Sequence, residues 1–143
     1  MASRTARDPL AVAAGALRFA SGVSFLVAPA RANVLWGGDP SDDSPTASLL
    51  LRSMGSRDAL VGALLLRAGW RGDARRVGGW FLASAGADAA DLVGGIANHD
   101  RMTPRSRAIG LGGAAVGIAV GLTGAVRAFG RRGTDESRRA RSS

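Results

Sequence analysis

The stretch Ser84–His99, SAGADAADLVGGIANH, places two carboxylates, Asp88 and Asp91, inside an otherwise apolar segment. An α-helix turns 100° per residue, so Ser84, Asp88, Asp91 and His99 fall along one polar stripe of such a helix. Its other sides carry Ala, Leu, Val and Ile. A polar stripe on an apolar helix requires partners that satisfy it. The sequence predicts those partners in the neighbouring helices.

Four apolar segments predict an all-α fold, a four-span transmembrane helix bundle with both termini on the same side. The first segment, 19 residues long, would span roughly 28 Å, about one hydrocarbon core. The expected spans are residues 10–28, 47–66, 77–97 and 108–126. They lie in a membrane domain, 10–129, between a basic flank, 1–9, and a basic tail, 130–143, which is expected to be disordered.

Two other interpretations of these segments remain. The mean hydropathy of +0.09 is low for a membrane protein, which leaves open a soluble, Ala-rich four-helix bundle. The first segment could also be a signal peptide, because Ala28-Pro29-Ala30 resembles a cleavage site. Arg18, in the middle of the apolar region, disfavours the signal peptide.

All 19 basic residues are arginine, and the net charge is +8. No aromatic residue interleaves with the arginine clusters as a base-stacking platform requires, so no nucleic-acid partner is expected. The arginines instead flank the apolar segments. Their excess beside the two termini and the middle loop predicts a multi-pass protein of the cell membrane with cytoplasmic N- and C-termini. Trp70 and Trp80 are expected at the inner interface and Trp36 near the outer one.

Six charged residues interrupt the predicted spans. An unpaired charge at the centre of a bilayer costs about 2.5–3.5 kcal/mol on insertion scales. Three are arginines and three are aspartates, so pairing inside the bundle can remove most of that cost. We therefore predict one buried polar cluster among the first three helices, with the Gly-rich fourth helix behind it. Its charged members are Arg18, Arg52, Arg57, Asp58, Asp88 and Asp91.

The cluster has two functional interpretations. In the first, it binds a lipophilic small molecule, with acid–base chemistry such as isomerisation or cyclisation, because a carboxylate in a dry pocket can hold a proton at neutral pH. The candidate catalytic residues are then Asp88, Asp91 and Asp58, and the candidate ligand-binding residues are Arg18, Arg52, Arg57, Ser84 and His99.

In the second interpretation, the charges are structural and fix the register of the helices, as buried ion pairs can. The protein is then a non-catalytic membrane subunit. A third class, an oligomeric transporter or proton conductor, is less favoured because four short helices enclose little volume. The sequence leaves open whether the chain is an enzyme.

No metal and no cofactor is expected. Asp88 and Asp91 form a DxxD pair, but two carboxylates are too few to hold a cation and the nearby arginines would repel it. Asp39, Asp42 and Asp43 could add ligands only if their loop folds over the bundle. A single histidine, His99, excludes haem held by two histidines of one chain. Phosphate-loop, dinucleotide and hydrolase motifs are absent.

The expected partners are membrane lipids, a lipophilic ligand and another helix. Gly113, Gly117 and Gly121 repeat at helical spacing in the fourth segment. Small residues at this spacing let a second backbone come close in a membrane. The sequence therefore predicts a homo-oligomer or partner-helix contact through these three glycines.

Two segments, GALRFASGVSFLVAPARANVLWG and LLLRSMGSRDALVGALLL, resemble one known family. It comprises small four-helix bacterial and fungal membrane proteins, catalogued as a domain of unknown function and loosely DoxX-like. The matching features are Arg18 before Gly22, Pro29-Ala30-Arg31, the run from Arg52 to Gly62, and an aspartate in the third helix. The resemblance covers roughly residues 10 to 127. It implies a four-span fold and no particular activity.

Overall fold

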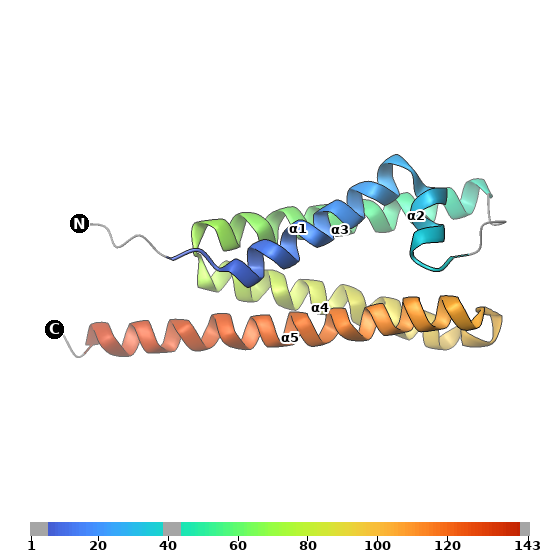
Figure 1. The fold of residues 1–143 in the computed structure, drawn as a ribbon. Helices are drawn as coiled ribbons and strands as arrows, with labels where there is room; N and C mark the ends of the chain where they lie inside the picture. The colour runs from blue at the N-terminus through green and yellow to red at the C-terminus, as the bar shows by residue number, and fades with distance from the viewer. Residues whose placement is uncertain (1–5, 39–43, 141–143) are drawn as a thin grey trace.

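Figure 1 shows, in a computed structural model, two antiparallel helical hairpins that lie along each other. The structure describes residues 6–38 and 44–140. The first hairpin pairs α1, Pro9–Val27, with α3, Pro45–Arg71, and the short α2, Pro29–Leu35, lies at its turn. The second pairs α4, Ala74–Ala97, with α5, Pro104–Ala140, after a 3₁₀ turn, His99–Arg101. No strand occurs in the described residues, and the predicted all-α class is confirmed.

Local capping fixes where the helices begin and end. Asp8 caps α1 through the backbone N–H of Ala11 at 3.1 Å. Ser44 caps α3 and Asp73 caps α4 in the same way. These side chains satisfy donors that a helix N-terminus leaves unpaired. Gly72, with φ of 65°, ends α3 in the left-handed conformation, and the chain turns directly into α4.

The observed helices extend beyond the predicted spans. Residues 29–35 follow the expected first span, 10–28, and form the helix α2, in which Pro29 occupies the first turn. α5 continues to Ala140, past residue 130, where a disordered tail was expected. Arg, Glu and Ala are good helix formers, so the tail composition is compatible with this extension. Asp39, Asp42 and Asp43 lie outside the described residues.

Glycines bring α1 and α3 into backbone contact. A Cβ atom at Gly22 would collide with the backbone of Ala59, and one at Gly62 would collide with the backbone of Phe19. Gly15 meets Leu66 in the same way one level further along. Approach this close, through small residues at regular helical spacing, is typical of helix pairs in membranes. The first hairpin is therefore held by backbone proximity rather than by large side chains.

The glycines of α5 face α4 within the same chain. Gly117 packs against the side chain of Asp88, and Gly121 packs against Ala85. No atom lies within 4 Å of a Cβ placed on Gly113. The groove predicted for a partner helix is thus largely filled by α4, and of its three glycines Gly113 alone faces open space.

A small apolar core joins the two hairpins at the end of the bundle where α1 begins and α5 ends. Its largest fully buried side chains are Phe81, Leu65 and Val77. Ala11, Ala68, Ala125 and Ala128 complete it. Figure 1 places this end opposite α2. The middle of the bundle therefore needs another means of joining the hairpins.

Two helical segments are long and apolar enough to cross a membrane, Pro9–Val27 and Pro104–Arg131. Only 22% and 17% of their most apolar windows are buried inside the chain. Large apolar side chains such as Val27 and Val126 are instead 76% and 72% exposed. α3 and α4 do not meet the same test; α3 contains Arg52, Arg57 and Asp58, and α4 contains Asp88 and Asp91.

Candidate functional site

Two bidentate arginine–aspartate pairs lie between the helical hairpins. Arg18 of α1 donates through Nη1 to Oδ2 of Asp88 and through Nη2 to Oδ1, both at 2.9 Å. Arg57 of α3 donates to the two carboxylate oxygens of Asp91 at 3.0 and 2.7 Å. In each pair the planar guanidinium matches the carboxylate with two parallel hydrogen bonds, the strongest arrangement available to these groups. Each pair also connects one hairpin to the other.

Asp58 bridges the two pairs through a single oxygen. Its Oδ1 accepts from Arg18 Nη2 at 3.0 Å and from Arg57 Nε at 3.1 Å. The hydroxyl oxygen of Ser84 accepts a further hydrogen bond from Arg18 Nη1 at 2.7 Å. We name these six residues the Arg–Asp cluster: Arg18, Arg57, Asp58, Ser84, Asp88 and Asp91.

The Arg–Asp cluster has a buried half and a more exposed half. The side chains of Arg18, Asp58 and Asp88 are 14%, 15% and 12% exposed. Those of Arg57 and Asp91 are 35% and 41% exposed. Two guanidinium groups face three carboxylates, so the formal charge of the cluster is −1 with every group ionised. Arg18 Nε is buried and makes no hydrogen bond within the described residues.

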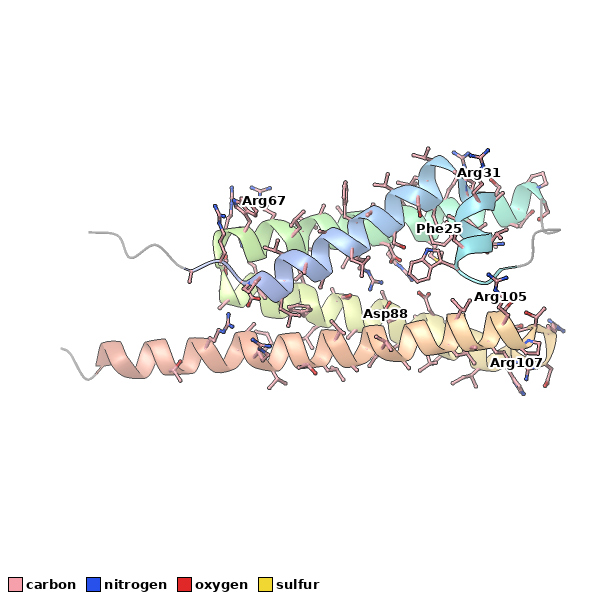
Figure 2. All side chains as sticks on the ribbon, in the orientation of Figure 1. Phe25, Arg31, Arg67, Asp88, Arg105 and Arg107 are labelled. Atoms are coloured by element: carbon pink, nitrogen blue, oxygen red, sulfur yellow. The ribbon has the colours of Figure 1, made fainter. Side chains whose placement is uncertain are left out.

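The helices place this cluster halfway along the bundle. Arg18 is the middle residue of α1, and Asp58 is the middle residue of α3. Figure 2 shows Asp88 on α4 in the space between the two hairpins. The cluster thus connects the hairpins beyond the reach of the apolar core.

All six members of the cluster are among the residues predicted from the sequence, but two other predicted residues lie elsewhere. Arg52 has an exposed side chain and takes no part in the cluster. Arg57 lies five positions further along the helix, a rotation of about 140°, so the two cannot point the same way. His99 lies beyond the end of α4, where its ring contacts the carbonyl of Ile96 and the carboxylate of Asp100. The structure therefore does not bring Arg52 or His99 to the Arg–Asp cluster.

A groove of about 400 Å³ lies on the first hairpin, away from the Arg–Asp cluster. It is lined by Phe19 of α1 and by Ala63, Leu66, Arg67, Trp70 and Arg71 of α3. The sequence analysis did not identify this groove. A signal was available, because residues 63, 66, 67, 70 and 71 have the spacing of one helix face.

Nothing in the described part of the chain resembles a metal centre, since no three His, Cys, Asp or Glu side chains gather closely enough to hold an ion. The three carboxylates of the Arg–Asp cluster are bound to guanidinium groups instead. As ligands they would have to exchange those hydrogen bonds for coordination.

Comparison with known proteins gives a family. Neither a curated protein nor a solved structure matches the chain. A family model described as Domain of unknown function (DUF4267) matches residues 15–126. The matched segment contains every residue of the Arg–Asp cluster. Because the match covers well over half of the chain, the chain belongs to the DUF4267 family.

Proposed function

We propose that this chain is a four-span integral membrane protein and a non-catalytic membrane subunit, in which the Arg–Asp cluster fixes the two hairpins to each other. One observation carries the proposal: the hydrogen bonds of both guanidinium groups go to the chain's own side chains. Asp88 and Asp91 each use both oxygens in a bidentate pair. An incoming substrate would have to break these bonds before it could meet a charged group.

The distribution of apolar side chains supports the membrane placement. Leu17 and Val27 of α1 and Val116 and Val126 of α5 are each at least 64% exposed. A soluble bundle would bury side chains of this kind, and a contiguous apolar exterior marks a surface that meets lipid or protein. The two apolar helices belong to different hairpins, so both hairpins would lie in the membrane. α3 and α4 would then cross it with the charges of the Arg–Asp cluster turned toward each other, whereas Arg52 is exposed near the start of α3.

Arginine distribution supports the orientation. The end of the bundle where α1 begins has the middle turn and the end of α5, and carries Arg7, Arg71, Arg75, Arg76 and Arg131 among others. The opposite end has fewer, and Figure 2 shows Arg31, Arg105 and Arg107 there. Because cytoplasmic flanks carry the excess of basic residues, we place both termini in the cytoplasm.

The membrane environment explains why this cluster would matter. Apolar surface gives little driving force for helix association when lipid is the alternative neighbour. Two bidentate pairs, in contrast, form only when the hairpins meet at one depth and one rotation. The Arg–Asp cluster would therefore determine the register between hairpins, a role that buried polar groups also have in coiled coils.

The test compares Asp88→Asn with wild type in detergent. In the structural role, the variant loses yield and melting temperature together, because a neutral amide with one acceptor oxygen cannot replace the bidentate carboxylate of Asp88, and Arg18 keeps only its single ion pair with Asp58. Sedimentation with membranes after carbonate washing tests the membrane placement independently. A chain that stays in solution without detergent would contradict the proposal.

A second candidate is a site for a lipophilic small molecule at the same cluster. The observation in its favour is Arg18 Nε, a buried donor without a partner in the described residues. Buried unsatisfied groups are uncommon in proteins. Under this alternative, wild type would retain an extractable small molecule that Asp88→Asn loses while its melting temperature stays unchanged.

A further inference from the structure

We infer that the groove on the first hairpin is a binding site for an anionic phospholipid of the cytoplasmic leaflet. The inference rests on the membrane placement proposed above, and it concerns a surface separate from the Arg–Asp cluster. None of the groove residues belongs to that cluster. Its volume of about 400 Å³ falls in the range of small-molecule sites.

The groove changes in character along the helix axis. Phe19, Ala63 and Leu66 form an apolar part that begins near the middle of the bundle. Arg67, Trp70 and Arg71 follow one to two turns later, at the end of α3. An acyl chain fits the apolar part, and a phosphate fits the basic part. From the bilayer interior to the interface, these two parts follow in the same order as the acyl chain and the headgroup of a phospholipid.

Electrostatic complementarity selects an anionic headgroup. The described carboxylates at this end of the bundle are Asp8 and Asp73, and both are bound to other arginines: Asp8 to Arg131 at 2.9 Å and Asp73 to Arg76 at 3.2 Å. Neither pairs with Arg67. Figure 2 shows Arg67 directed away from the second hairpin, toward the surroundings of the bundle. Basic residues beside a membrane surface attract anionic lipids.

Trp70 provides the interfacial element of the site. The residue is 54% exposed, and the Arg7 guanidinium lies over its ring, 3.9 Å from the ring centroid. This cation–π contact brings a third positive group to the basic end of the groove. Tryptophan prefers the headgroup level of a bilayer. Its position therefore places Arg67 and Arg71 at the depth of lipid phosphates.

Native mass spectrometry of the full chain in detergent tests the inference. Equal amounts of dioleoylphosphatidylglycerol and dioleoylphosphatidylcholine are added, and inorganic phosphate is tested in a separate arm. We expect wild type to retain phosphatidylglycerol in preference to phosphatidylcholine. Arg67→Gln combined with Arg71→Gln should reduce that preference roughly 30-fold. The matched control, Arg75→Gln with Arg127→Gln, makes the same charge change outside the groove and should leave the preference unchanged.

Several results would overturn the inference: equal retention of both lipids by wild type, equal loss in the control pair, or displacement of the lipid by phosphate alone, which would indicate an ion site. If the variant with both groove arginines replaced fails to fold, a measurement on the wild-type chain still tests the inference. Phosphatidylglycerol brominated on its acyl chains should quench tryptophan fluorescence more than brominated phosphatidylcholine does, and equal quenching would contradict the site. If these lipid tests fail but the chain still resists carbonate extraction from membranes, only the lipid site is refuted, and the proposed membrane role stands.

Discussion

Replacing Arg18 with glutamine removes the group on which the Arg–Asp cluster depends most. The substitution deletes four hydrogen bonds, two to Asp88 and one each to Asp58 and Ser84. Asp88, 12% exposed, then has no cationic partner among the described residues, whereas Asp58 keeps Arg57. The formal charge of the cluster changes from −1 to −2. Breaking a buried ion pair from one side costs about 3–5 kcal/mol.

The loss is measurable as thermal unfolding in detergent, followed by circular dichroism. For a chain of this size we expect the melting temperature of Arg18→Gln to fall by about 10 °C or more. Arg52→Gln is the matched control. Arg52 is exposed and outside the cluster, so its loss should change stability by less than about 0.5 kcal/mol. Equal effects of the two substitutions would refute the reasoning, because they would show that Arg18 bears no special share of the hairpin contact.

Further substitutions test three other parts of the structure. Asp58→Asn keeps the bridging oxygen and removes the surplus negative charge, so thermal unfolding should shift by less than about 1 kcal/mol; a loss as large as that of a broken ion pair would contradict this. Gly22→Ala forces the first hairpin apart and should lower the free energy of unfolding by about 1–3 kcal/mol, whereas Gly113→Ala, in open space, should leave it unchanged. Equal unfolding curves for the two variants would argue against the backbone contact. In the cysteine-free background, Thr134→Cys should be protected in intact cells from a membrane-impermeant maleimide and Thr46→Cys should react; the reverse pattern would invert the proposed topology.

Apolar segments predicted the four long helices because hydropathy is a local property of the chain. The apolar segments are long enough for helices, and Pro29, Pro45 and Pro104 mark helix starts. The continuation of α5 was missed because the tail is hydrophilic. Hydropathy indicates whether a segment lies in lipid or in water, and a hydrophilic segment can still be helical. The short helix α2 was missed because seven residues are too few to show a period.

Apart from Arg52 and His99, the site was predicted in membership but not in pairing. Depth along each span was enough to bring Arg18 and Asp88 together, since both lie near the middle of their helices. The pairing of Arg57 with Asp91, and the bridging role of Asp58, depend on helix rotation, which follows from the close contact of α1 with α3. The sequence alone was sufficient to exclude Arg52 from the site, because an angle of about 140° around the helix separates it from Arg57 and puts it on another face.

The most direct test of the Arg–Asp cluster is a double-mutant cycle on Arg18 and Asp88 in the detergent-solubilised chain. Stabilities of Arg18→Gln, Asp88→Asn and the combined variant are compared with wild type. The account predicts that the combined variant is little less stable than Arg18→Gln alone, which corresponds to a coupling energy of at least about 1.5 kcal/mol. Losses that simply add would show that the two hairpins are not joined through this pair.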